Sequence, residues 1–410
     1  MSKPKNRNLF KANLSKPVIL ICVFIHIHLM AFGQVRMITI NPMQTDPRIK
    51  TFIADSHRIY TNDQVSKRAD LLIYLPASFY LTNSASLYCA TAADAGYRVI
   101  SLAYPGTDKM DFTCQHSTDP ACYENFHREI TEGKNYSNNI IVDSLEGVFY
   151  RLKALLIHLN KTQPSQGWNE YLENNELKQS AIIWSGHSDA AGHVAVIAKY
   201  NSIKRAVCFS GPMDFSLHYY LPPAWLGSGV WKTDKSNIYV FGHISDEYTF
   251  QKEIWDSLGM SKYGKNININ QNSYPYINSH TLVTSTSIAI GDVHECTILD
   301  SKTPMDKNKP QYESVWKYLL NIALATSPTL YLNKAIIKLH PNPVRSGAEL
   351  YFDTNKVLSE FDIYSAFGQK VFSGRINKGV IHLPSLKNGN YFIKIENEHK
   401  AVVNKIIVLE

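Results

Sequence analysis

The sequence lacks the cysteine and histidine spacings that hold metal ions. It contains no CxxC motif, and no cluster of cysteine and histidine has the spacing of a zinc site. Four scattered histidines include no pair at the i, i+4 spacing of a helical zinc site. These are His187, His193, His243 and His280. We therefore expect neither a metal ion nor another cofactor.

Positive charge is scarce once the N-terminus is set aside. The formal net charge is +7 over 410 residues, and the first 33 residues contribute +5 of it without any acidic residue. The remainder is therefore near +2 (7 − 5). Such weak basicity argues against nucleic acid as a partner. The five N-terminal charges belong to Lys3, Lys5, Arg7, Lys11 and Lys16.

The sequence has one long hydrophobic run, near its N-terminus. The run "PVILICVFIHIHLMAFG" (17–33) follows the basic stretch "MSKPKNRNLFKANLSK", and the small residues Ala31 and Gly33 precede Gln34 at positions −3 and −1. This pattern predicts a secretory signal peptide over residues 1–33, with a retained membrane anchor as the alternative. We expect a mature chain with no retained transmembrane segment. It would be exported through the periplasm and then secreted or held at the cell surface.

Cysteine is sparse as well, and five of the six residues remain after the leader. Cys114 and Cys122 flank the polar loop "CQHSTDPAC", and export permits disulfides. We predict that these two form a bridge, worth about 2–3 kcal/mol because it closes a short loop; free thiols are the alternative. The other three have apolar neighbours, which favours buried free thiols. They are Cys89, Cys208 and Cys296.

From about residue 50 to 325, strand-like runs alternate with helix-like ones. This alternation predicts an α/β fold with a mostly parallel sheet and helices on both faces, the doubly wound arrangement. The expected strands cover 70–77, 97–105, 180–186, 203–211 and 237–244. The expected helices cover 84–95, 138–160, 189–201, 249–260 and 311–325.

Near residue 328 the pattern changes to period-2 runs separated by Gly and Asn turns, without a helical stripe. This predicts a small all-β sandwich after the α/β part. The expected organisation is therefore a signal peptide (1–33), an α/β domain (34–327) and a C-terminal β domain (328–410).

The stretch "IIWSGHSDAAGH" (182–193) carries the main chemical signal. Gly186-His187-Ser188-Asp189-Ala190 fits G-x-S-x-G with alanine in the last place. Small residues are needed two before and two after the serine because the strand turns there abruptly into a helix. We predict that Ser188 is a nucleophile. The alternative is that its hydroxyl caps the following helix.

A nucleophilic serine needs a base and an orienting carboxylate, in the chain order Ser, acid, His. Asp246 ends the strand "NIYVFGHISDE" and is the predicted acid, with Glu247 and Asp214 as rivals. For the base we predict His294, in "GDVHECTI" just before the last helix. His280 is the rival and is expected at a strand edge.

An oxyanion hole requires two backbone N–H donors. One should be Asp189, directly after the nucleophile, and the other Ala77 or Ser78, in the loop after "LLIYLP". The acidic side chain of Asp189 must point away from a developing oxyanion, and capping of the helix start would satisfy it.

These features resemble the α/β-hydrolase superfamily, and within it a little-characterised family of secreted bacterial hydrolases. The matching stretches include "LLIYLP", "AADAGYRVISLAYPG", "FHREITEG", "GHSDAAGHVAVIAK", "FSGPMDF" and "HECTI", between about residues 70 and 300. The resemblance implies the triad Ser188, Asp246 and His294. It departs at Asp189 and Ala190, where such families more often show Gln-Gly.

The C-terminal part resembles the sorting domain of the type IX secretion system. The resemblance rests on "HPNPV" (340–344), "DIYSAFGQKV" (362–371), "IHLPSLKNGNYFIKI" (381–395) and the terminal "KIIVLE". It implies that this domain addresses the chain to the type IX machinery. A carbohydrate-binding or adhesive module is the alternative.

Together these observations predict a secreted serine hydrolase, a carboxylesterase acting on a small-molecule or glycan ester through an acyl-enzyme. A peptidase or amidase with the same triad is an alternative, as is a non-catalytic surface protein that uses the fold for binding. The aromatic segment "HYYLPPAWLGSGVW" (218–231) either lines a substrate cleft or covers the core.

Overall fold

A computed structural model describes residues 35–106, 109–246, 250–323, 339–352, 360–365, 369–376, 379–397 and 400–409. The predicted signal peptide and the rival acid Glu247 lie outside these ranges. The chain divides into two compact units, Met1–Ile322 and Ala323–Glu410. We call them the larger unit and the C-terminal unit.

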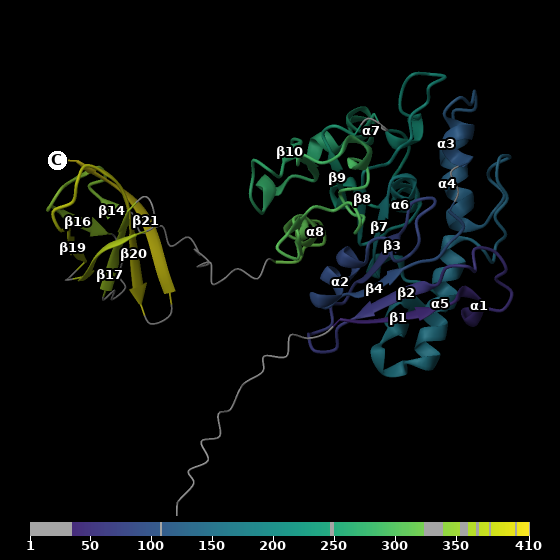
Figure 1. Cartoon of the computed structure of the whole chain (residues 1–410), viewed down its shortest axis with the longest axis horizontal. Coiled ribbons are helices and arrows are strands. Elements are labelled where there is room, and N and C mark those ends of the chain that lie inside the picture. Colours follow the sequence, from purple (N-terminus) through teal and green to yellow (C-terminus); the bar gives the residue numbers. More distant parts are fainter. Residues whose placement is uncertain are drawn as a thin grey trace, which may run out of the picture. The chain divides into compact units, whose positions relative to one another are not determined.

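The larger unit is built on one nine-stranded sheet with the order β1-β2-β4-β3-β7-β8-β9-β11-β10 (Figure 1). β2 runs antiparallel to β1 and β4, and all other neighbours are parallel. The bounds are β1 (Arg36–Ile40), β2 (His57–Thr61), β3 (Leu71–Leu75), β4 (Arg98–Ser101), β7 (Ile182–His187), β8 (Arg205–Phe209), β9 (Ile238–His243), β10 (Ile267–Asn268) and β11 (Thr281–Thr284). Two short hairpins add β5 (Leu172–Glu173) with β6 (Glu176–Leu177), and β12 (Met305–Asp306) with β13 (Lys309–Pro310).

Helices cover both faces of this sheet (Figure 1). Alternate residues of β3 enter two separate hydrophobic clusters, because successive strand side chains point to opposite faces. Residues of α3 to α7 join one cluster and residues of α2 and α8 the other. The predicted α/β fold is thus confirmed. The helices are α1 (Pro42–Thr45), α2 (Ser86–Asp94), α3 (Lys109–Cys114), α4 (Cys122–Glu132), α5 (Val148–Thr162), α6 (Asp189–Tyr200), α7 (Gln251–Leu258) and α8 (Glu313–Leu319).

The helix predicted over 138–160 begins ten residues later, at Val148, and this part of the prediction was wrong. Gly147 packs so closely on the preceding helix end that a Cβ there would lie 2.7 Å from Gly133 N. Upstream, the buried Glu129 carboxylate accepts hydrogen bonds from backbone N–H groups of Ser137 and Val142. These contacts fix an irregular backbone, so the apolar stripe alone overestimates the helix.

The C-terminal unit is the predicted all-β sandwich. A three-stranded sheet, β14-β16-β19, and a five-stranded sheet, β15-β21-β20-β17-β18, share one hydrophobic cluster (Figure 1). The strands are β14 (Leu339–His340), β15 (Val344–Arg345), β16 (Glu349–Phe352), β17 (Glu360–Ser365), β18 (Lys370–Arg375), β19 (Val380–His382), β20 (Gly389–Asn397) and β21 (Lys400–Leu409).

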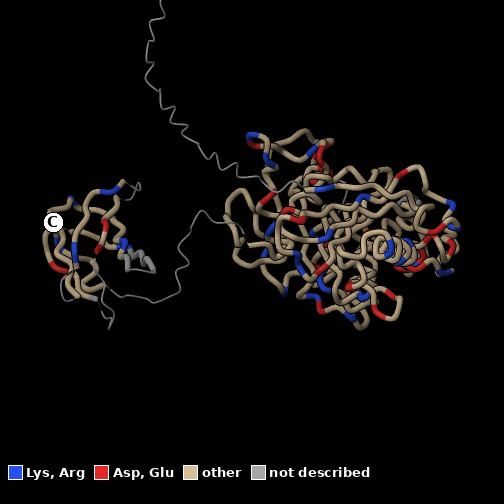
Figure 2. The backbone as a smooth tube through the Cα atoms, turned by 90° about the horizontal axis from the view of Figure 1, so that it is seen from below, with Lys and Arg blue, Asp and Glu red and all other residues tan. Residues whose placement is uncertain are grey.

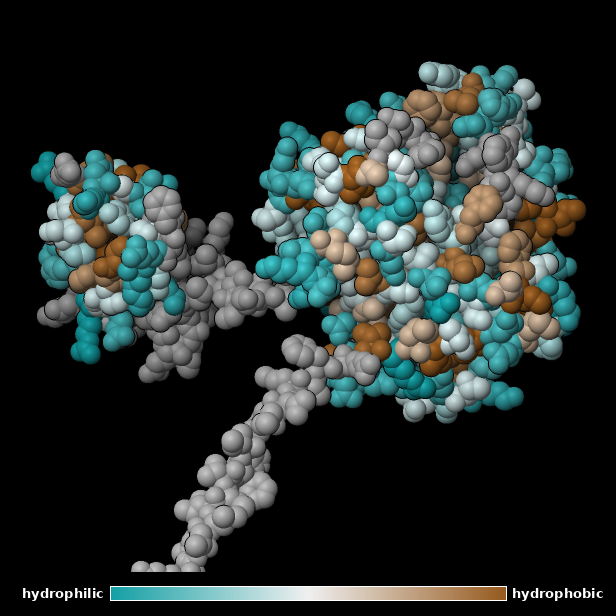
Figure 3. Space-filling view, in the orientation of Figure 1, coloured by the Kyte–Doolittle hydropathy of each residue, from teal (hydrophilic) through white to brown (hydrophobic). Residues whose placement is uncertain are grey.

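The surface of the larger unit is mixed in charge and polarity. Lysine and arginine are interspersed with aspartate and glutamate along its backbone (Figure 2). On the face shown in Figure 3, hydrophobic side chains occur in small groups among hydrophilic ones. Within the described ranges, no helix has the length and apolar character needed to cross a membrane.

Candidate active site

Ser188 stands at a sharp turn between β7 and α6, in the middle of the sheet. Its backbone has φ 61° and ψ −124°, a conformation that non-glycine residues rarely adopt and that is found preferentially at functional sites. The turn requires a small residue at position 186, because a Cβ on Gly186 would lie 2.5 Å from the carbonyl oxygen of Ala190. The strand–turn–helix context of the motif is therefore present.

The structure brings Ser188, His294 and Asp246 together. Ser188 Oγ lies 2.8 Å from His294 Nε2, and His294 Nδ1 lies 2.8 Å from Asp246 Oδ2. Since a carboxylate only accepts, the Nδ1 proton faces Asp246 and Nε2 is left to accept from the serine hydroxyl. Gln251 Nε2 donates a further hydrogen bond to Asp246. The side chains of Ser188, His294 and Asp246 are nearly buried.

Ser188 occupies the N-cap position of α6, but its side chain makes no capping hydrogen bond. Besides His294, its Oγ contacts the sulfur of Met213, at 2.6 Å. The hydroxyl is thus directed away from the helix end, towards the imidazole.

The rivals of the predicted acid and base have other partners. His280 stacks on Tyr239, with ring centroids 4.0 Å apart, and borders β11 as expected. Asp214 is fully buried and bonds to His127 and Trp225. These hydrogen bonds and the ring contact lead to residues other than Ser188 and His294.

The Asp189 side chain is held by the loop that follows β3. Its Oδ1 accepts from the backbone N–H of Ser78 at 3.0 Å, and its Oδ2 accepts from the Ser78 hydroxyl at 2.5 Å. Burial raises the pKa of this carboxyl, and the hydrogen bonds from Ser78 oppose that shift. The contact spans 111 positions of sequence, which explains why the sequence suggested only a helix cap.

The same contact distinguishes the two candidates for the second oxyanion donor. The Ser78 N–H is already engaged by Asp189. The Ala77 N–H makes no hydrogen bond within the described ranges. Of the two, Ala77 is therefore the one with a donor available.

His187, the variable residue of the elbow, has a supporting contact that the sequence did not reveal. It is fully buried, and its Nε2 donates to the backbone carbonyl of His294 at 3.1 Å. Burial lowers the pKa of His187 to about 3, so the ring is neutral. The neutral ring anchors the backbone that carries the imidazole of the triad-like arrangement. The one feature of the sequence that could have indicated this role is the position of His187 inside the G-x-S-x-G-like motif.

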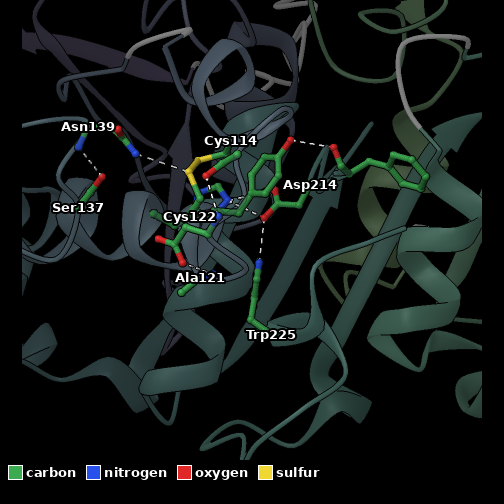
Figure 4. The surroundings of a disulfide bond; sticks show 12 residues. Cys114, Ala121, Cys122, Ser137, Asn139, Asp214 and Trp225 are labelled. Carbon is green, nitrogen blue, oxygen red and sulfur yellow. Dashed lines mark hydrogen bonds and ion pairs between the residues drawn. A yellow bond between two sulfur atoms is a disulfide. The ribbon is translucent and has the colours of Figure 1, made fainter. Parts of the chain in front are cut away.

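A second imidazole–carboxylate pair lies behind the elbow. His127 Nε2 is 3.1 Å from both carboxylate oxygens of Asp214, and His127 Nδ1 is 2.7 Å from His193 Nδ1. Trp225 donates to the same carboxylate (Figure 4). A Cβ on Gly192 would lie 2.3 Å from the His127 ring, so this approach of α4 to α6 needs glycine there.

Cys114 and Cys122 form the predicted disulfide, at the end of α3 and the start of α4 (Figure 4). The loop that it closes supports the aromatic segment: Tyr219 donates to the carbonyl of Thr118, and the Leu217 N–H donates to Gln115. The remaining cysteines are buried free thiols, as predicted: Cys89, Cys208 and Cys296.

Part of the aromatic segment covers the core, as one of the two expectations had it. Trp225 and Leu226 are buried and cover the core, whereas Tyr219, Tyr220 and Leu221 are exposed. Across the described ranges, no group of three or more His, Cys, Asp or Glu side chains is arranged to hold a metal ion.

The strand order and the elbow define the larger unit as an α/β-hydrolase fold. Residues 338–409 match the family of the secretion system C-terminal sorting domain. The C-terminal unit is thus a sorting domain, as its likeness to type IX domains predicted, and the chain is exported, to the cell surface or beyond.

Two solved structures are similar to parts of the chain. A Klebsiella pneumoniae protein assigned as a dienelactone hydrolase is 11% identical, over 70% of this chain and 98% of that chain, with a TM-score of 0.35. PorZ, a surface component of the type IX secretion system of Porphyromonas gingivalis, is 11% identical over 20% of this chain and 13% of its own, with a TM-score of 0.16. No curated protein matches the chain.

Proposed function

We propose that the larger unit is an exported serine hydrolase that cleaves carboxylic esters. The observation that supports this most is the continuous line of hydrogen bonds from Asp246 through His294 to Ser188, at a strained strand–helix turn. Nucleophile, base and orienting acid in this geometry are what acyl transfer needs.

In the proposed reaction, Ser188 Oγ attacks the ester carbonyl carbon as His294 Nε2 takes the hydroxyl proton. The Asp246 carboxylate stabilises the imidazolium that forms. Collapse of the tetrahedral intermediate breaks the bond to the alcohol oxygen, which receives the proton from His294. Water then repeats the sequence on the acyl-enzyme, releasing the acid and restoring Ser188.

Negative charge on the carbonyl oxygen would be stabilised by the backbone N–H groups of Asp189 and Ala77. Asp189 follows the nucleophile at the start of α6, where the helix dipole also favours an anion. The carboxylate of Asp189 is bound by Ser78, which supports the expectation that its charge points away from the oxyanion.

Labelling with a fluorophosphonate probe tests the nucleophile. The intact protein should be labelled, and Ser188→Ala should abolish labelling and lower ester turnover by about 10⁴–10⁶-fold. Equal labelling of both proteins would reject Ser188. An unlabelled, inactive wild-type protein would favour a binding protein on the same fold.

A pair of conservative variants tests the acid. Asp246→Asn should lower kcat by about 10⁴-fold, because the amide holds the wrong imidazole tautomer. Asp214→Asn is the matched control, since it changes an equally buried carboxylate that is hydrogen-bonded to His127 and Trp225. It should alter stability and leave kcat within about tenfold. The reverse order of effects would transfer the role to Asp214.

A further inference from the structure

A cavity of about 480 Å³ opens at the carboxyl ends of β3 and β4. Ala77 comes from the loop after β3, Tyr104 and Gly106 from the loop after β4, and Phe52 and Phe79 from its rim. Its volume lies in the range of small-molecule sites. No part of the triad-like arrangement lines it.

The polar side chains of Asp55 and Tyr104 at the wall of this cavity already have hydrogen-bond partners. The Asp55 carboxylate accepts from the backbone N–H of Thr82 at 2.6 Å and from the Thr82 hydroxyl. The Tyr104 hydroxyl donates to the carbonyl of Pro76 at 2.6 Å. Apart from the Ala77 N–H, which is proposed to face the oxyanion, the cavity therefore offers an occupant apolar and aromatic surface, which suits an uncharged hydrophobic group.

Two aromatic residues at the rim are held in an unfavourable conformation. Phe52 has φ 47° and Phe79 has φ 69°, and bulky side chains rarely adopt this left-handed region. Both rings are exposed, Phe79 to 83%, so burial in the core does not compensate the strain. Such residues cluster at ligand-binding sites, where an occupant covers them.

The position of the cavity relative to Ser188 identifies the part of the substrate that would enter it. The leaving alcohol must face His294, which protonates it, and His294 is held by Asp246 at the end of β9. β9 lies on one side of β7 and β3 lies on the other. Ala77, the proposed oxyanion donor, lines the cavity on the β3 side. The substituent that points there is the acyl group.

We propose that this cavity binds the acyl group of the substrate, and that the preferred esters carry an aromatic acyl group, such as a phenylpropanoyl group, rather than an acetyl group. The inference rests on the proposed esterase function and adds the substrate class. Aromatic guests fit because Phe52, Phe79 and Tyr104 provide ring faces and edges.

The test uses the full-length protein with p-nitrophenyl esters that share one leaving group. The ratio of kcat/KM for 3-phenylpropanoate over acetate should exceed about 10, since each buried methylene contributes up to this order. Gly106→Val should lower that ratio at least about tenfold by filling the cavity. The fold has room for it, because a Cβ at Gly106 meets its nearest neighbour, Ser78 Cα, at 3.7 Å.

A second pair of variants separates the cavity from general damage. Phe79→Asn removes a rim ring while keeping a residue that tolerates positive φ, and it should also lower the ratio. Tyr220→Asn is the matched control, because Tyr220 is likewise aromatic, exposed and at φ 55°, but lies outside the cavity. It should leave the ratio unchanged.

The outcomes distinguish the two proposals. Three results would overturn the cavity assignment while the protein remains an esterase. Gly106→Val could leave the ratio unchanged, the ratio in this variant could respond to the size of the alcohol instead of the acyl group, or the enzyme could prefer octanoate. Binding of methyl 3-phenylpropanoate to Ser188→Ala, measured by NMR and weakened by adding Gly106→Val, supports the cavity. If the wild type then cleaved no ester, only the catalytic proposal would fall.

Discussion

The interiors of the two units differ in kind. Every buried side chain described in the C-terminal unit is apolar, from Leu339 in β14 to Val408 in β21. The larger unit buries histidine, aspartate, glutamate and arginine as well, among them His57, Arg151 and Asp214. Burying such groups costs stability unless each finds a partner.

The larger unit must hold reactive groups in place, whereas the C-terminal unit needs only a stable fold. In the C-terminal unit, paired strands and aliphatic packing suffice, and recognition is left to its surface. In the larger unit, polar side chains are fixed by specific distant partners, as Asp189 is by Ser78. A sorting domain can therefore be attached to different cargo, whereas the geometry of the larger unit depends on its own contacts.

The largest effect should come from removing one unit entirely. Deleting residues 329–410 should block release from the cell, because the sorting address is lost, while the larger unit recovered from cells keeps its ester turnover. Immunoblots of medium and cell fractions measure the first, and a chromogenic ester assay the second. Full-length Ser188→Ala is the control and should be exported normally. Normal release of the truncated chain would show that the two units do not divide these tasks.

A smaller effect is expected where a polar contact supports the site. Asp189→Ala should lower kcat by about 10–100-fold, because the loop that carries Ala77 loses its anchor and one oxyanion donor is displaced. Ser78→Ala removes the hydroxyl and keeps the backbone N–H, so its effect on kcat should be weaker. Steady-state kinetics of both variants measure this. Full activity of Asp189→Ala would show that the contact between Asp189 and Ser78 has no role in catalysis.

The smallest effect should appear on mild acidification. Burial lowers the pKa of His57 and of His187 to about 3, and lowers that of His193 well below 6.5. At these three histidines the unfolded chain binds more protons than the native larger unit between about pH 6.5 and 3, so their contribution to the free energy of unfolding should fall as pH decreases through this window.

Tryptophan fluorescence reports this change selectively, because all six tryptophans belong to the larger unit. Urea titrations at about pH 7, 5.5 and 4.5 should show a falling midpoint. Hydrogen exchange of peptides from 339–409 should change less. His57→Gln keeps an acceptor for the Ala103 N–H and should reduce the pH dependence. Equal acid sensitivity of the two units would contradict the comparison.

The sequence predicted what is local in the chain. Short apolar runs predicted the central strands. Gly186 and Ala190 around Ser188 predicted a tight turn, and the structure shows the close backbone approach that requires small residues there. The start of α5 was mispredicted because Gly133 and Glu129, distant from Val148, decide it. The partner of Asp189 and the role of His187 depend on contacts across the sheet, which periodicity does not encode.

Gly192 has a consequence for how this protein can change. Its missing Cβ admits the His127 ring to the backbone of α6, where Asp214 and His193 meet it. Substitutions at these four positions are therefore epistatic: a double-mutant cycle should show strong coupling, and one change would alter which others are tolerated. A library that varies them singly would sample mainly destabilised proteins, whereas joint variation could move the whole set to another packing.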